Sequence, residues 1–458
     1  MASRCRNCNS HRNLHHIHVV VVNKRILRLA IPNIVSNITI PLLGMVDLAL
    51  MGHLDSVNYI GAIALGAMIF NFLYWGFGFL RMGTSGFTAQ AYGRRSMPDS
   101  IHTLARALLI AFMGALLLIL LQYPIEKLTF WLISSEPEVE QLARSYFYIR
   151  IWAAPATIGL YALNGWYVGM QNTRFPMFMA ILINLVNIGL NILFVFGLNM
   201  KSDGVALGTL LAQYSGLFFG LFLFRKYYGK LLKHFKRESL KNISILKEFM
   251  AVNKDIFIRT LCIIIVFTFF TSSSAAVNKH ILAVNTVLLQ LFFVYSYFVD
   301  GFAYAAEALT GKYFGAQDAV LLKKSVKKLF VWGLGIAVVF SAVYGFGWRP
   351  VIWLLTDNAS VINAAGEYSI WIGLMPLMAF ASFLWDGIYI GATASVQMRN
   401  SMLIATLVVF FPVFYILRPY FGNHALWIAL LAFLLTRGIA QYFMANRAVF
   451  SKVLSKRA

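Results

Sequence analysis

The chain has 458 residues, of which 60% are hydrophobic and only 12% are charged. Soluble domains carry a charge on about 25% of their residues, so this composition, with a mean hydropathy of +0.71, excludes an ordinary soluble protein. The formal charge of +22 would suit a nucleic-acid-binding protein, but the basic residues lie in clusters between long apolar runs. We therefore expect a membrane protein with the lipid bilayer as its surroundings and no nucleic acid as a partner.

Apolar runs of about twenty residues recur along the whole length, and each could cross a hydrocarbon core of about 30 Å as a helix. The expected spans are 26–51, 60–90, 101–123, 142–169, 176–198, 204–225, 246–275, 281–311, 327–347, 364–391, 399–418 and 424–446. This pattern predicts an all-α polytopic membrane protein with about twelve transmembrane helices.

Basic residues are concentrated in alternate loops, around 94–95, 225–247 and 312–328, and again at the C-terminal end, 447–457. The intervening loops, such as GHLDSVNY and SSEPEVEQ, are poorer in them. Because cytoplasmic loops of membrane proteins are enriched in Lys and Arg, this alternation predicts that both termini are cytoplasmic. We expect a multi-pass membrane protein.

The spans divide the chain into a tail, two halves and a linker. Residues 1–23 form the tail, which we expect to be disordered; its Cys5 and Cys8 suggest zinc ligands, but no second ligand pair completes a site. An amino-terminal six-helix lobe (24–225), a basic cytoplasmic linker (226–245), a carboxy-terminal six-helix lobe (246–446) and a basic tail (447–458) follow.

The first span contains an acidic residue, Asp47, in the stretch GMVDLALMGHLD. A carboxylate within a membrane costs about 2.5–3.5 kcal/mol on insertion scales and commonly faces a cavity or a partner. The simpler interpretation is a hydrated acid near the outer end of the span. We favour a functional acid, because Asp47 lies at least a turn inside that end and follows Pro32 and Pro41, where a helix can bend.

The fifth span carries three amides, Asn184, Asn187 and Asn191. Their spacing of i, i+3 and i+7 places them on one face of a helix. Amides on an apolar helix must bond to a neighbouring helix or to water. Both a structural bond between helices and the wall of a polar cavity remain open.

The two halves are related in sequence. Gly165 and Gly169 in NGWYVG match Gly387 and Gly391 in DGIYIG, since 387 minus 165 and 391 minus 169 both give 222. The distant motifs TAQAYG and TGKYFG have the same offset. Such a duplication is typical of transporters, and both halves start on the same side, so we expect a parallel repeat with a pseudo-two-fold axis along the membrane normal.

The carboxy-terminal half has acids of its own. Asp300 and Asp386 lie within its spans, whereas the position that matches Asp47 is Phe269. Asp386 matches Asn164 of the first half, since 164 plus the offset of 222 is 386. These two acids could line a second polar pocket or could be paired with other side chains, and both alternatives stay open.

No catalytic constellation appears in the sequence. A Walker loop, an HExxH pair and a Gly-x-Ser-x-Gly elbow are all missing from it. We therefore expect no enzymatic activity, no cofactor, no metal site and no ATP drive within this chain.

Several stretches together carry a family resemblance: AIPNIVSNITIPLLGMVDLALMGHL, GTSGFTAQAYG, NGWYVGMQNTRFP, LVNIGLNILFVFGLNMKSDGVALGT and VDGFAYAAEALTGKYFGAQD. Through them, the chain after the tail resembles the multidrug and toxic compound extrusion (MATE) family. The branch that it most resembles is named for the DNA-damage-inducible protein F. The resemblance implies two six-helix lobes and the exchange of H⁺ or Na⁺ for organic, often cationic or amphipathic, compounds. We expect the location to be the bacterial inner membrane.

The resemblance also implies roles for particular residues. The coupling acid of the family falls on Asp47, and the proline at which the first helix bends falls on Pro32. The polar positions of the amino-terminal lobe fall on Tyr146, Asn164, Asn187 and Thr209. The branch commonly has an acid at the position of Asn191, so this chain departs from the pattern and lacks a second titrating carboxylate there.

These features favour a secondary antiporter in which protonation of Asp47 is coupled to export by alternating access. The expected coupling ion is H⁺, with Na⁺ less favoured, and the expected partners are small organic substrates of a monomeric protein. The alternative is a flippase of a lipid-linked precursor, which would need cationic side chains such as Arg81 and Arg259 in its path.

Overall fold

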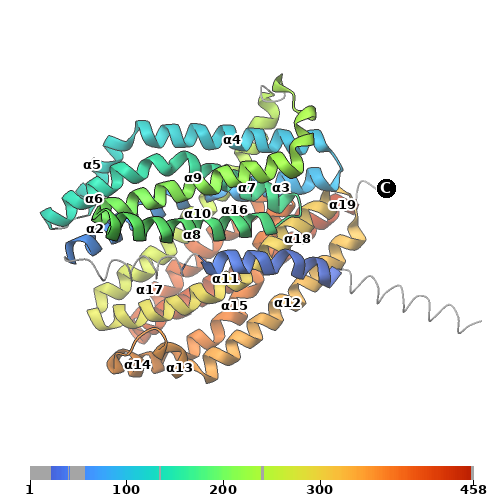
Figure 1. Cartoon of the computed structure of the whole chain (residues 1–458). Coiled ribbons are helices and arrows are strands. Elements are labelled where there is room, and N and C mark those ends of the chain that lie inside the picture. The colour runs from blue at the N-terminus through green and yellow to red at the C-terminus, as the bar shows by residue number, and fades with distance from the viewer. Residues whose placement is uncertain (1–21, 40, 42–56, 134–135, 239–241, 455–458) are drawn as a thin grey trace, which may run out of the picture. The chain divides into compact units, whose positions relative to one another are not determined.

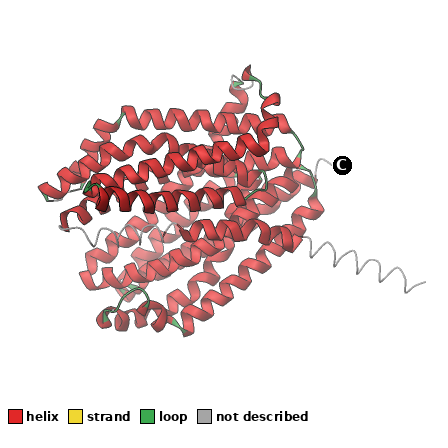
Figure 2. Ribbon diagram, viewed as in Figure 1, coloured by secondary structure: helices red, strands yellow, loops and turns green. Residues whose placement is uncertain are grey.

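The computed structural model describes residues 22–39, 41, 57–133, 136–238 and 242–454. This part of the chain is helical and contains no β-strand (Figure 2). Ten of its helices are long and apolar enough to cross a membrane. The predicted class, an all-α polytopic membrane protein, is therefore confirmed.

By the contacts among its residues, the chain forms two compact units (Figure 1). One unit comprises the described residues from 35 to 261, which we call the N unit. The other comprises the described residues up to 34 and from 262 onward, which we call the C unit. The chain passes from one unit to the other inside two helices, residues 22–39 and α10 (Ile243–Val277).

The N unit is built from α-helices with shorter helical turns between some of them. They are α2 (Val57–Trp75), α3 (Gly78–Gly93), α4 (Met97–Leu120), α5 (Gln122–Leu132), α6 (Pro137–Arg150), η1 (Ile151–Ala153), α7 (Ala154–Gly169), α8 (Arg174–Ile192), η2 (Leu193–Gly197), α9 (Lys201–Tyr228) and η3 (Gly229–His234). The first part of α10 and residues 35–39 also belong to this unit.

The C unit follows the same plan. It contains residues 22–34, the second part of α10, α11 (Lys279–Gly315), α12 (Ala319–Phe346), α13 (Trp348–Trp353), α14 (Ala359–Ala365), η5 (Gly366–Tyr368), α15 (Ser369–Gly391), α16 (Ser395–Leu403), η6 (Ile404–Phe410), α17 (Phe411–Phe421), α18 (His424–Ala445), η7 (Asn446–Phe450) and α19 (Ser451–Leu454). A large cluster of buried hydrophobic side chains lies in its core, and the N unit has hydrophobic clusters of its own.

The ten candidate spans coincide with ten of the twelve predicted ones, with ends that differ by less than three helical turns. The two remaining predictions fall on helix as well. The fourth predicted span is formed by α6, η1 and α7, where a short 3₁₀ turn joins two helices. The first is helical over residues 22–39, and most of the rest of it, including Asp47, lies outside the described residues. The predicted tail also lies outside them, apart from residues 22 and 23, which are helical.

The sequence repeat extends to the packing of the helices. A Cβ atom on Gly165 of α7 would overlap the main-chain oxygen of Arg81 of α3. In the C unit, a Cβ atom on Gly387 of α15 would overlap the main-chain oxygen of Ala303 of α11. The partners Arg81 and Ala303 have the same sequence offset as the two glycines, so the same close crossing of two helices occurs in each unit. Only glycine allows the two backbones to approach so closely.

A second crossing repeats in the same way. Gly169 packs on the main-chain oxygen of Ser85, and Gly391 packs on that of Glu307. These partners again have the offset of the repeat, since 307 minus 85 gives 222. The α3–α7 pair and the α11–α15 pair are thus one packing arrangement used twice.

The turns at the ends of these pairs also match. Arg95 and Gln317, which occupy equivalent positions of the repeat, end their helices with left-handed φ values of 56° and 55°. The next residues, Ser96 and Asp318, cap the following helices: each side chain accepts a bond from the backbone N–H three residues on, at 3.4 Å and 3.0 Å. Agreement at helix crossings and at caps indicates that the two halves share one fold.

Candidate functional site

The three amides predicted to share a face lie on α8 of the N unit. The Asn191 Nδ2 donates to the Asn187 Oδ1 at 3.0 Å, and the Asn187 Nδ2 donates to the Thr209 Oγ1 of α9 at 3.0 Å. The Thr209 hydroxyl in turn donates to the main-chain oxygen of Val205 at 2.9 Å. The side chains of Asn187, Asn191 and Thr209 are buried. The sequence predicted the shared face, and the structure joins it to α9 by a chain of directed hydrogen bonds.

Asn191 sits deepest in this chain of bonds and is fully buried. Its Oδ1 occupies the space that a side chain on Gly208 would need, so a glycine in α9 makes room for the amide. A π-helical turn, η2, begins two residues after Asn191. Such turns inside α-helices are frequent at functional sites. The position where a second acid would stand is therefore a closely packed amide.

Asn184 makes a different contact from its two neighbours. Its Nδ2 donates to the main-chain oxygen of Thr39 at 3.1 Å. Thr39 ends the continuous described part of the first helix, residues 22–39. Asn184 thus ties α8 to the first helix upstream of the predicted coupling acid Asp47, which itself lies outside the described residues.

Tyr146, Asn164 and Pro32 also have defined places. Tyr146 is fully buried on α6, and its hydroxyl accepts a hydrogen bond from the guanidinium of Arg150. The Arg150 guanidinium carbon lies 5.3 Å from the ring centroid of Phe70. Asn164 is on α7, with a buried Oδ1 that has no hydrogen-bond partner among the described residues. Pro32 is buried inside a helix that continues on both sides of it, over residues 22–39.

Arg150 is a charged residue that our sequence analysis did not include in the site. It is the last residue of α6, at the point where the helix changes to the 3₁₀ turn η1 and continues into α7. A basic residue inside a predicted apolar span is the signal that could have identified it, because such residues are costly in a membrane.

In the C unit, Asp386 forms a buried ion pair. The Arg437 Nη2 lies 2.6 Å from the Asp386 Oδ2, and the Gln441 Nε2 donates to the Asp386 Oδ1 at 2.7 Å. Arg437 and Gln441 are one turn apart on α18, whereas Asp386 lies on α15. Of the two alternatives left open by the sequence, the structure thus has Asp386 paired. The repeat does not preserve this pair, because the N unit has Asn164, Ser215 and Phe219 at the matching positions.

Asp300 is the other acid predicted in this half. It is half-buried on α11, the helix that also carries Tyr295 and Tyr297. The Tyr295 hydroxyl itself donates to the main-chain oxygen of Pro376 at 3.0 Å. Asp386 is thus paired with a buried arginine, whereas Asp300 lies half-buried on α11. Across the described ranges, no group of three or more His, Cys, Asp or Glu side chains is arranged to hold a metal ion.

The MatE family model matches the chain twice, at residues 32–193 and at residues 256–418. The chain therefore belongs to the MATE family of transporters, and the two matches correspond to its two halves. It is 38% identical over 430 residues to DNA damage-inducible protein F of Escherichia coli K12, in an alignment that covers 91% of each chain. The predicted resemblance to that branch is confirmed.

Two further likenesses extend this result. The chain is 23% identical over 434 residues to Protein DETOXIFICATION 44, chloroplastic, of Arabidopsis thaliana, covering 92% of this chain and 81% of the relative. A crystal structure of a MATE protein in the bent conformation superposes with a TM-score of 0.83 at 20% identity, covering 96% of this chain and 99% of that one. At this identity the superposition shows the shared fold.

We expect Asn187→Ala to reduce efflux more than Asp300→Asn or Asp386→Asn does at equal amounts of folded protein. The alanine would remove the acceptor of Asn191 and a donor to Thr209, and leaving buried polar groups unbonded costs about 1–3 kcal/mol each. The measurement is dye efflux per folded protein, with the folded amount determined by fluorescence-detected gel filtration. Equal or reversed damage would move the important polar groups to the C unit.

Proposed function

We propose that this protein is a proton-coupled antiporter that exports organic, often cationic or amphipathic, compounds. Family membership supports the transport of small organic molecules across a membrane. The coupling ion and the alternating-access cycle are our inference. We further propose that the protein works as a monomer in the bacterial inner membrane, with both termini in the cytoplasm.

The choice of the proton rests on one observation, the neutral side chain at position 191. Asn191 is fully buried, and its amide donates to Asn187 and packs closely on Gly208 of α9. A sodium site built from two carboxylates would want an acid there, because hard cations are held by several oxygens and favour carboxylates. A proton requires only one titrating acid, and we assign that role to Asp47.

In the proposed cycle, Asp47 exchanges its proton for the exported compound. Loss of the proton places a charge in the first predicted span, and uptake of a proton removes it, which would change the hydration and the partners of that span. A ligand or proton shifts a conformational equilibrium only as far as it prefers one state. The Asn184 bond to Thr39 is a direct link by which such a change could reach α8.

The test is efflux of a monovalent cationic dye from proteoliposomes with pH and sodium gradients imposed separately. We expect a pH gradient to drive efflux in the absence of sodium, since the proposal needs a single titrating group. Efflux driven by sodium alone, with no response to pH, would show the ion assignment to be wrong. Activity that depends on a polyprenyl phosphate in place of the dye would support the flippase alternative.

A further inference from the structure

A strongly basic stretch follows the last turn of α9. We call residues 225–238 the basic segment; it contains η3. It has six basic residues, Arg225, Lys226, Lys230, Lys233, Lys236 and Arg237, against a single acid, Glu238, and all seven side chains are exposed. In the described part of the chain none of the six forms an ion pair. Their charge is therefore available to an anion outside the protein.

The basic segment is held in a defined place on the N unit. Tyr228 and Leu231 pack against a cluster of buried hydrophobic side chains from α4, α7, α8 and α9. The Asn172 Nδ2 donates to the Tyr228 hydroxyl at 3.3 Å. Further on, the backbone N–H of Lys236 donates to the Nε2 of His102 on α4 at 3.1 Å. The backbone of the segment is thus fastened near its start and near its end, which keeps its exposed basic side chains on one part of the N unit.

Apolar side chains are exposed among the basic ones. Tyr227 is 59% exposed, Leu232 42% and Phe235 38%. The Lys226 ammonium lies 5.5 Å from the centroid of the Tyr227 ring, so charge and apolar surface alternate within one turn. Aromatic and aliphatic groups interleaved with Lys and Arg are typical of segments that lie in the interface of a bilayer.

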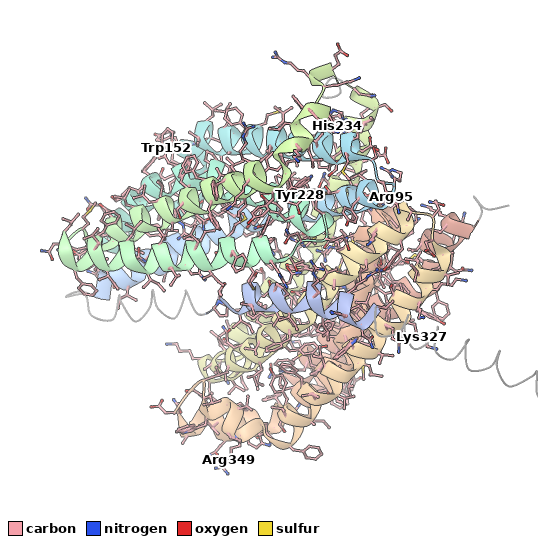
Figure 3. All side chains as sticks on the ribbon, turned by 45° about the vertical axis from the view of Figure 1, so that its right-hand side comes forward. Arg95, Trp152, Tyr228, His234, Lys327 and Arg349 are labelled. Carbon is pink, nitrogen blue, oxygen red and sulfur yellow. The ribbon has the colours of Figure 1, made fainter. Side chains whose placement is uncertain are left out.

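The location of the basic segment also suits contact with the interface of a bilayer. It leaves the end of α9 sideways and passes beyond α4 (Figure 1). Figure 3 shows Tyr228 among the helices of the N unit and His234 farther out on the projecting part. The outer sides of α4 and α9 carry exposed apolar residues such as Phe112, Leu116 and Phe218, as expected of surfaces that face lipid. The basic segment therefore begins where a lipid-facing surface ends.

We propose that the basic segment is a binding site for the headgroups of anionic phospholipids. Its Lys and Arg side chains would contact the phosphates, while Tyr227, Leu232 and Phe235 insert among the first carbons of the acyl chains. Basic residues next to a membrane span bind anionic lipid with about a fivefold gain in affinity each. This proposal does not depend on which compound the protein exports.

The test places a fluorophore on the segment in the full-length protein. Leu232→Cys is labelled in a chain in which Cys5, Cys8 and Cys262 have been replaced by Ala. Quenching is then measured in liposomes that contain a brominated phosphatidylglycerol or a brominated phosphatidylcholine at equal mole fraction. We expect half-maximal quenching at a mole fraction of the anionic lipid at least about tenfold lower, because several basic groups act together. Half-molar salt should reduce this preference, since it screens exposed charges.

Two variants provide the matched comparison. Replacing Lys230, Lys233, Lys236 and Arg237 by Gln should abolish the preference for phosphatidylglycerol. Replacing Lys323, Lys324, Lys327 and Lys328 of α12 by Gln removes the same charge elsewhere and should leave the preference intact. Free inorganic phosphate should not compete, which separates a headgroup at a membrane from the anion alone.

Several results would overturn the proposal. Equal quenching by the two lipids in the labelled protein that keeps all its lysines would contradict the proposal. This comparison does not use the quadruple variant, so a folding defect in that variant cannot affect it. Loss of the preference in the α12 variant as well would show that total charge, and no particular segment, attracts the lipid. Competition by free phosphate would identify a simple anion site.

Discussion

Asp47→Asn should give a protein that reaches the membrane in normal amounts but no longer drives efflux from an imposed pH gradient. The amide has nearly the shape of the carboxyl group, and it resembles the protonated acid, so the fold should tolerate it. What it cannot do is lose a proton. The variant should therefore behave like the protonated protein throughout, and its efflux should equal that of liposomes without protein.

The readouts are membrane abundance, dye binding and gradient-driven efflux, each measured on the same preparations. Asp55→Asn is the matched control, because it removes the next acid along the chain, in the polar stretch GHLDSV. A variant that binds dye but does not respond to the pH gradient is the expected outcome. If Asp47→Asn fails to accumulate while Asp55→Asn is normal, Asp47 is a structural acid and the coupling role is wrong.

Position 191 gives a companion test of the ion. Asn191→Asp should increase the response to sodium, because it places a carboxylate at the position where the branch commonly has an acid. The hydrogen bonds allow the change: Asn187 can turn its amide to donate to the new acid, and its oxygen can then accept from the Thr209 hydroxyl if that hydroxyl turns away from the Val205 oxygen. An unchanged ion response in a stable Asn191→Asp protein would show that position 191 does not select the ion.

The second large effect that we expect is on stability, at the buried ion pair of the C unit. Asp386→Asn would leave the Arg437 guanidinium buried without its counter-charge, and Arg437→Gln would leave the carboxylate in the same condition. Removing one partner of a buried pair costs about 3–5 kcal/mol. Each single variant should therefore lower the thermal midpoint and the amount of folded protein.

The double variant Asp386→Asn with Arg437→Gln is the control. It removes both charges while keeping amides that can bond to each other and to Gln441, so most of the lost stability should return. Midpoints are measured on detergent-purified protein, and efflux is expressed per folded molecule. A coupling role for Asp386 would instead appear as a stable double variant without efflux, and this would contradict the structural role assigned to the pair.

Local pattern was enough to predict the class of fold. The length and hydropathy of the apolar runs predicted helices that the structure forms, because a helix that spans a bilayer must satisfy its own backbone hydrogen bonds. The common offset of the motifs around Gly165 and Gly387 predicted a duplication, and the structure has the same close backbone approach at both glycines. The spacing of Asn187 and Asn191 likewise predicted a shared helical face.

The partners of these residues depended on tertiary structure. Asn187 bonds to Thr209, 22 positions further along the chain, because Gly208 allows α9 to lie against α8 at that depth. Asp386 bonds to Arg437, 51 positions away, whereas the Oδ1 of its repeat counterpart Asn164 has no hydrogen-bond partner within the described part of the chain. Helical periodicity acts over a turn or two and determines which face a side chain occupies. Which residue meets it there is decided by how helices pack, and that is set by contacts between segments far apart in the sequence.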